Sequence, residues 1–165
     1  MTTLLRPQLY VGSLMDIPLD KLRARKIRAF IVDLDNTITE WNSRELRLEI
    51  VNWFSLIRDQ GFKTCILSNN NEQRIQEVAV KLGIPFIHRA QKPLRRSFRR
   101  ALDIMEVNAD EAAVIGDQIF TDILGGNRAG LYTILVKPLA RREFMGTKIS
   151  RALELLVLRY LRLKI

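Results

Sequence analysis

The sequence predicts an α/β fold in which a parallel sheet is covered by helices on both faces. Short apolar runs recur along the 165 residues, and segments with helical periodicity separate them. Strands joined by helices of this length need right-handed crossovers, which make the strands parallel. The hydrophobic fraction of 47% is normal for a globular protein, and the length suits a single domain over residues 1–165.

Five short apolar runs are the expected strands. They are apolar almost throughout rather than alternating, which is typical of strands that are buried on both faces of a sheet. They cover residues 29–32, 64–67, 85–88, 112–115 and 132–136.

Helices are expected between these strands and after the last one. Ser43 and Asn71 are suitable N-caps, and glycines follow two of the periodic segments where helices commonly end. The expected helices run from Ser43 to Gly61, from Asn71 to Gly83, over 93–105, over 119–128, and from about 147 to 165.

Positive charge is concentrated in two parts of the chain. The sequence has 27 Lys and Arg against 18 Asp and Glu, a formal net charge of +9. Residues 89–100 hold six basic residues and no acid, and residues 137–165 hold eight basic residues and two acids. Such a surplus favours an anionic partner, which could be nucleic acid, an acidic membrane surface or a phosphorylated substrate.

Each basic region has two interpretations. Arg95, Arg96, Arg99 and Arg100 form one helical stripe, which fits either a solvated face or a surface directed at phosphate. On a helical wheel over residues 147–165 the basic side chains fall in a narrow arc and most of the remainder is apolar. That pattern fits an amphipathic helix on lipid or a helix that covers the sheet, and the sequence leaves both open.

We expect a cytoplasmic protein, and it would be peripheral on the inner face of the membrane if the helix over 147–165 lies on lipid. No charged segment precedes an apolar stretch and a cleavage site, as it would in a secretory signal. No run of about 18 apolar residues could span a bilayer. The single cysteine, Cys65, excludes a disulfide framework and a cysteine-based zinc site, and it fits a buried apolar position.

Polar side chains follow four of the expected strands at the point where each strand ends. In chain order they are Asp33 and Asp35, Ser68 and Asn69, Lys92, and Asp117 with Asp122. Ligands of open parallel sheets bind beyond the carboxyl ends of the strands, so these side chains should gather in one place. Carboxylates at close range repel unless a cation lies among them, and an oxygen-only ligand set suits Mg²⁺.

These four elements, in this order, resemble the haloacid dehalogenase superfamily of phosphotransferases. The resemblance covers roughly residues 27–136 and implies a three-layer Rossmannoid sandwich with a phosphatase site. Family members that act on small metabolites often carry an inserted cap domain. The gaps between Asp33, Ser68 and Lys92 are too short for one, so we expect no cap domain. An open site of this kind suits a macromolecular or membrane-bound substrate.

The resemblance also implies a role for each residue. Asp33 would be the nucleophile that forms an aspartyl-phosphate, and Asp35 the general acid and then the general base. Ser68 would hydrogen-bond a phosphoryl oxygen, Asn69 could also donate to the phosphate, and Lys92 would neutralise phosphoryl charge and hold Asp33. The implied ligands of Mg²⁺ are Asp33, Asp35 through its backbone carbonyl, Asp117 and Asp122.

A narrower resemblance is to the YqeG-type family, which includes the mitochondrial phosphatidylglycerophosphatases. The residues that carry it are Pro7, Tyr10, Val11, 17–22, 33–37 with Trp41, 68–70, Lys92, Pro93, and 116–118 with Thr121 and Asp122. It implies conversion of phosphatidylglycerophosphate to phosphatidylglycerol, with an anionic lipid as partner at a membrane surface. Ser68 stands where many superfamily members have Thr, which keeps the hydroxyl.

Two other functions stay open. The chain could be a soluble phosphatase of nucleotides, sugar phosphates or phosphoproteins. It could also be a basic RNA- or ribosome-binding module with an idle site, although the intact set of strand-end residues and the scarcity of stacking aromatics make nucleic acid the less favoured partner. Trp41, which follows the first motif, could shape the rim of the site or simply pack.

Overall fold

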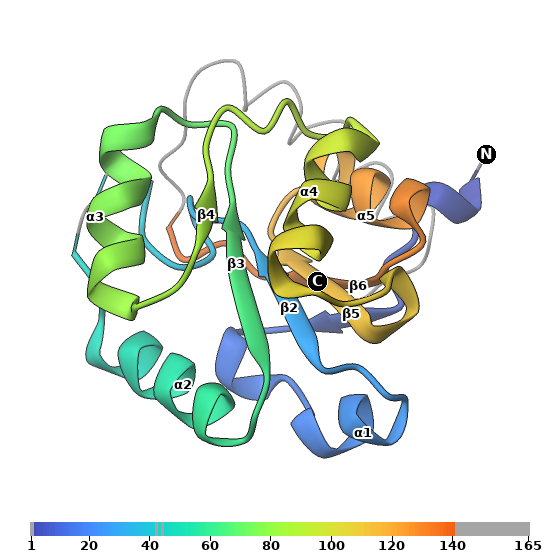
Figure 1. The fold of residues 1–165 in the computed structure, drawn as a ribbon, viewed down its shortest axis with the longest axis horizontal. Coiled ribbons are helices and arrows are strands. Elements are labelled where there is room, and N and C mark those ends of the chain that lie inside the picture. The colour runs from blue at the N-terminus through green and yellow to red at the C-terminus, as the bar shows by residue number, and fades with distance from the viewer. Residues whose placement is uncertain (1, 42, 44, 141–165) are drawn as a thin grey trace.

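A six-stranded sheet in which every neighbouring pair of strands is parallel runs through the middle of the molecule (Figure 1). The computed structural model describes residues 2–41, 43 and 45–140. Across the sheet the strand order is β1-β6-β5-β2-β3-β4. The strands are β1 (Leu9–Val11), β2 (Ala29–Val32), β3 (Lys63–Leu67), β4 (Phe86–Ile87), β5 (Ala112–Gly116) and β6 (Tyr132–Val136).

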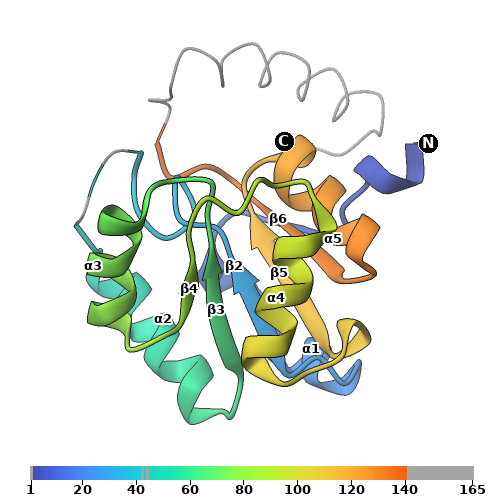
Figure 2. The ribbon, with the colours of Figure 1, turned by 45° about the horizontal axis from the view of Figure 1, so that its top comes forward.

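Helices cover both faces of this sheet, which gives three layers (Figure 2). The α-helices are α1 (Leu19–Ala24), α2 (Leu48–Asp59), α3 (Glu72–Leu82), α4 (Arg95–Met105) and α5 (Leu124–Ala129). Short 3-10 turns occur at Thr2–Leu5, Leu14–Asp16 and Ala109–Glu111.

The two hydrophobic layers divide the side chains of the central strand between them. Phe30 and Val32 of β2 pack on one face with apolar residues of α1, α2 and α3. Ala29 and Ile31 face the opposite layer with Phe98 and other residues of α4. All four β2 side chains are fully buried, which explains why this run is apolar throughout rather than alternating. The expected three-layer parallel fold is confirmed.

Both ends of α3 follow the local sequence signals. The Asn71 side chain accepts a hydrogen bond from the Arg74 N–H at the start of α3, and Gly83 ends that helix with a φ of 67°.

Cys65 is fully buried in the layer beneath α4, as its apolar run predicted. Burial raises the pKa of its thiol to about 12, with a smaller opposing effect from Arg100.

The prediction that Ser43 caps the first long helix was wrong. That helix, α2, begins at Leu48, and its N-cap position is Arg47. The Ser43 hydroxyl instead accepts the N–H of Glu45, two residues on, which closes a local turn and leaves the helix to start later.

The helix expected over 119–128 is divided into two parts, and its neighbours have shifted ends. Ile119–Ile123 forms a π turn, in which the Ile123 N–H donates to the Gln118 carbonyl, and α5 follows it. The helix expected from 93 is α4, which starts at Arg95. The strand expected over 85–88 is β4, which is shortened to Phe86–Ile87. Strand β1 and helix α1 were not predicted.

Within the described part of the chain, no helix is both long enough and apolar enough to cross a membrane. The amphipathic helix expected over about 147–165 lies outside the described residues.

Candidate active site

The predicted site residues follow strands that lie next to one another in the sheet. β3, β2 and β5 are neighbours, and their carboxyl ends lead into Ser68, Asp33 and Asp117. Lys92 comes from the loop after β4, and Asp122 from the π turn after β5. Because all the strands are parallel, these positions share one edge of the sheet.

Lys92 is the centre of a buried ion-pair network. Its Nζ lies 2.5 Å from Asp33 Oδ1 and 2.6 Å from Asp122 Oδ1. The three side chains are 4%, 7% and 1% exposed, in the order Lys92, Asp33 and Asp122. Removing one partner from such a pair leaves an uncompensated buried charge, so each member holds the others in place.

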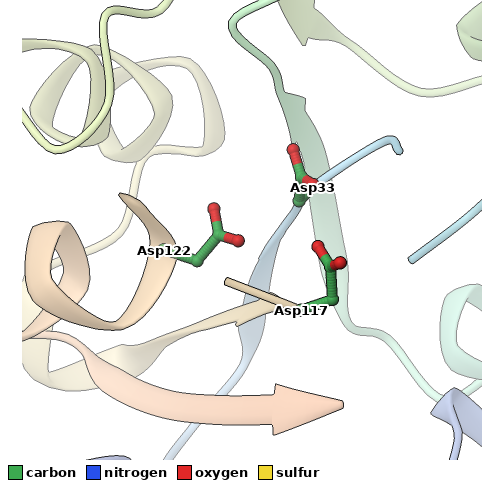
Figure 3. A group of neighbouring side chains, drawn as sticks. All are labelled: Asp33, Asp117 and Asp122. Carbon is green, nitrogen blue, oxygen red and sulfur yellow. The ribbon is translucent and has the colours of Figure 1, made fainter. Parts of the chain in front are cut away.

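A third carboxylate joins the pair of acids. Oxygen atoms of Asp33, Asp117 and Asp122 all lie within 4.8 Å of one another, and the three residues are buried. Figure 3 shows these side chains converging from two strand ends and the helical turn after β5. One lysine cannot balance three carboxylates, so the cluster keeps a negative charge that fits a hard divalent cation.

Titration of these groups reflects burial and their mutual charge. Burial raises the pKa of Asp122 to about 6, opposed by Lys92 and reinforced by Asp33. For Lys92, burial alone would lower the pKa, but the carboxylates of Asp122 and Asp33 outweigh it and raise the pKa above its ordinary value. The lysine therefore stays a cation throughout the physiological range.

Gly116 makes room for Asp122. A Cβ at this position would lie 2.2 Å from Asp122 Oδ2 and 2.3 Å from its Cγ, closer than atoms can approach. The Asp122 carboxylate also accepts the Gln118 N–H at 3.2 Å, which fixes it over the glycine. Glycine at the end of β5 is thus required to leave space for the Asp122 carboxylate.

Asp35 lies apart from the carboxylate cluster and contacts the α3 side of the site. Its Oδ1 pairs with the Arg74 guanidinium, and its Oδ2 accepts a hydrogen bond from Asn70 Nδ2. The Arg74 and Asp35 side chains are only 11% and 14% exposed. Sequence reasoning missed Arg74 because it lies in the first turn of a helix rather than at a strand end.

Ser68 and Asn69, which with Lys92 were expected to bind phosphate, have different surroundings. The Ser68 hydroxyl is buried and accepts the Asn70 N–H at 3.2 Å. Asn69 holds the backbone of Lys92 from both sides: its Oδ1 accepts the Lys92 N–H at 2.8 Å, and its Nδ2 donates to the Lys92 carbonyl at 3.4 Å. Asn69 therefore positions the lysine, whether or not it also contacts a ligand.

A pocket of about 360 Å³ opens above these groups. Its lining residues are Asp33, Asp35, Trp41, Ser68, Asn69, Asn70, Lys92, Gln118 and Thr121. Trp41 is 38% exposed at the rim of the pocket. Its backbone N–H donates to the buried Asn36 Oδ1 at 3.3 Å. Trp41 thus lines the pocket, while Asn36 fixes the loop that carries it.

The sequence model of the haloacid dehalogenase-like hydrolase family matches residues 17–130 of this chain. The matched range includes every predicted site residue. This chain belongs to that family.

Relatives of this hydrolase agree with the match. "Probable phosphatase YqeG" of Bacillus subtilis (strain 168) is 40% identical over 158 residues, which cover 96% of this chain and 92% of that protein. "Phosphatidylglycerophosphate phosphatase 1, chloroplastic/mitochondrial" of Arabidopsis thaliana is 27% identical over 94% of this chain but only 48% of its own length. The predicted family and its YqeG-type branch are confirmed, and the chain is a phosphatase.

A solved structure has the same fold. The cobalt-bound deoxy-D-mannose-octulosonate 8-phosphate phosphatase of Haemophilus influenzae superposes with a TM-score of 0.56 at 16% identity, and the match covers 84% of this hydrolase and 90% of that chain. Hydrolases of this family generally use a divalent metal, and the buried acidic triad of Asp33, Asp117 and Asp122 fits one.

Proposed function

We propose that this hydrolase removes a phosphate monoester through an aspartyl-phosphate on Asp33, uses Mg²⁺, and acts on phosphatidylglycerophosphate at a membrane surface. The observation that carries the proposal is the placement of Asp33. Its carboxylate lies at the floor of an open pocket, is held 2.5 Å from Lys92, and borders two further buried acids.

The reaction needs two displacements at phosphorus. An oxygen of Asp33 attacks, the Asp33–phosphorus bond forms, and the bond to the lipid oxygen breaks while Asp35 gives that oxygen a proton. Asp35 then takes a proton from water, whose oxygen attacks phosphorus and releases Asp33 and inorganic phosphate. Lys92 and the Ser68 hydroxyl offset the charge on the phosphoryl oxygens in both steps.

Mg²⁺ would be held by Asp33, Asp117 and Asp122, with the Asp35 backbone carbonyl as a further ligand. When bound, it supplies the positive charge that lets an anionic nucleophile approach an anionic substrate. The oxygen-only donor set of the triad supports this choice of ion.

Three observations support a lipid substrate. Between β2 and β4 the described residues contain α2, β3 and α3 and no cap domain, so the pocket is not enclosed by an insert. Trp41 at the rim and Leu94, two residues beyond Lys92, are 38% and 50% exposed, which suits contact with lipid. The Arabidopsis relative named as a phosphatidylglycerophosphate phosphatase matches 94% of this chain.

We further place all 165 residues in one phosphatase domain that binds peripherally to the inner face of the membrane. The basic stretch 147–165 would contribute an amphipathic helix to that contact. Flotation with anionic vesicles tests this part, and protein that stays at the bottom of the gradient would contradict it.

The decisive experiment is phosphate release from vesicles that contain phosphatidylglycerophosphate. We expect turnover with Mg²⁺ and none after chelation. Asp33→Asn should lower kcat by at least about a thousandfold, because the amide cannot form the acyl-phosphate. Asp20→Asn, at a side chain that is 98% exposed, is the matched control and should retain full activity.

Two results would reject parts of the proposal. Release of phosphate only from soluble monoesters would reject the lipid substrate and favour a soluble phosphatase. Turnover by Asp33→Asn near the wild-type rate would reject the nucleophile.

A further inference from the structure

A second pocket, of about 380 Å³, lies between helix α4 and the loop that follows β4. Three arginines line it, Arg89 from the loop and Arg96 and Arg100 from successive turns of α4, and no lining residue is acidic. His88, Gln91 and Ser97 complete its polar lining. We call this the arginine pocket.

The three arginines of this pocket have no acidic partner in the part of the chain that the structure describes. Within residues 2–41, 43 and 45–140, none of its three arginines forms an ion pair, and all three are exposed. Other arginines in the same part of the chain do pair: Arg28 contacts Glu111, and Arg74 contacts Asp35. Neighbouring guanidinium groups with no acid between them repel, and an anion removes that cost.

The start of α4 also favours an anion. The first turn of α4 contains no acid, and no side chain caps its N-terminus, so the positive end of the helix dipole adds to the arginine charge beside Arg96 and Ser97. His88 also lines the pocket, and its Nε2 lies 3.9 Å from the carboxylate of Glu72, which is not a lining residue.

The arginine pocket is tied to the catalytic pocket by the loop that separates them. Within this loop, Lys92 lines the catalytic pocket, while Arg89, Gln91 and Leu94 line the arginine pocket. The Ala90 N–H donates to the Ser68 carbonyl at 3.0 Å, and the Arg89 N–H donates to the Asn70 carbonyl at 2.9 Å. One wall therefore serves both pockets, so a ligand with two anionic groups could engage both.

We propose that the arginine pocket binds the phosphodiester group of an anionic glycerophospholipid while the catalytic pocket processes a phosphomonoester. Phosphatidylglycerophosphate carries both groups, so this inference rests on the proposed function and assigns its substrate specificity. The diester is bound and not cleaved. It comes either from the substrate molecule itself or from a neighbouring lipid, and both sources present the same two charged oxygens to the guanidinium groups.

A matched pair of double variants tests the arginine pocket. Arg96→Ala with Arg100→Ala removes two lining charges, and Arg95→Ala with Arg99→Ala removes two exposed charges from the same helix that do not line it. The probe is glycerophosphoglycerol, a soluble phosphodiester, measured by calorimetry. We expect the first pair to weaken binding by about tenfold or more and the second to change it by less than about twofold. Equal losses in both pairs, or no loss in either, would overturn the proposal.

Lipid presentation separates the two sources. With phosphatidylglycerophosphate in a neutral detergent micelle, a rise in KM that exceeds any change in kcat for Arg96→Ala with Arg100→Ala assigns the substrate's own diester. If KM is unchanged there but flotation on phosphatidylglycerol vesicles falls, a neighbouring lipid is the source. An effect in neither assay overturns the proposal.

The binding measurement does not depend on turnover, so the two proposals fail separately. If the wild-type protein binds glycerophosphoglycerol through Arg96 and Arg100 but releases no phosphate from phosphatidylglycerophosphate, the arginine pocket stands and the proposed substrate falls. If it hydrolyses this lipid and the double variant binds the probe as the wild type does, the arginine pocket falls alone.

Discussion

At the scale of single residues, Lys92 is a buried cation that pairs with two buried acids of the site. It contacts two carboxylates directly, and a third, Asp117, lies within 4.8 Å of both. When no metal ion is bound, Lys92 is the positive charge that pairs with Asp33 and Asp122 among the described residues. The Asn69 side chain forms hydrogen bonds with the backbone N–H and carbonyl of Lys92. Contacts to the backbone and to the ammonium group together fix the position of this lysine.

Replacing Lys92 should therefore damage stability as well as activity. Lys92→Met leaves buried acids without a partner, which should cost about 3–5 kcal/mol of unfolding free energy in chelator. Urea unfolding measures this, and added Mg²⁺ should recover part of the loss. Lys21→Met, at an exposed lysine, is the control and should stay within about 0.5 kcal/mol of the wild type. Similar unfolding curves for both variants would contradict the assigned role.

Gly116 offers a second test at the residue scale. Gly116→Ala would force Asp122 away from its place, because the added Cβ would lie 2.2 Å from Oδ2. We expect kcat to fall by at least about tenfold, since small misplacements of catalytic groups are costly. Circular dichroism should show that the fold is retained, and an unchanged kcat would show that Asp122 is free to move.

At the scale of elements, the contact between α4 and α5 supports the loop that carries Lys92. A Cβ on Gly125 of α5 would lie 2.4 Å from the Phe98 ring of α4 and 3.2 Å from the Cα of Pro93. The helices can approach this closely only because the residue is glycine. The close contact ends beside Pro93, the residue next to Lys92.

Gly125→Ala should destabilise the protein by about 1–3 kcal/mol through overpacking, as measured by urea unfolding. Combining it with Phe98→Leu, which removes atoms from the clashing ring, should recover part of that loss. The sum of the two single effects should therefore exceed the effect of the double variant. Strict additivity would show that the ring and the glycine do not interact.

Some elements could be predicted from the sequence and others could not, for identifiable reasons. β2 and β5 are apolar runs buried on both faces, and they were found to within a residue. β1 has only three residues, all half-buried, so it has neither the length nor the apolar character of a strand signal. The π turn at Ile119–Ile123 was missed because its residues keep a helical pattern.

The site was predictable where strand ends determine it. Asp33, Lys92, Asp117 and Asp122 come together because parallel strands deliver their following residues to one edge. Arg74 pairs with Asp35 across elements, and nothing in its local sequence marks that contact. The roles of these residues in catalysis stay predictions.

For the whole molecule, the buried acidic triad should couple metal binding to stability. Mg²⁺ at about 100 times its dissociation constant should stabilise the folded state by about 2.7 kcal/mol, which corresponds to a rise in Tm of about 5–10 °C. Scanning calorimetry with and without Mg²⁺ measures it. Asp117→Asn should reduce the rise, and Asp20→Asn should preserve it; equal shifts in the two variants would place the ion elsewhere.

The order of strands in the sheet has a consequence for biosynthesis. β2 lies beside β5, although the whole α2–α4 segment separates them along the chain. A polypeptide still emerging from the ribosome can pair β2 with β3, yet it lacks Asp117 and Asp122 until β5 inserts on the other side of β2. The ability to hydrolyse phosphate esters should thus appear late in folding, only after β5 has paired with β2. A chain that ends before β5 would therefore expose Asp33 without Asp117 and Asp122 beside it.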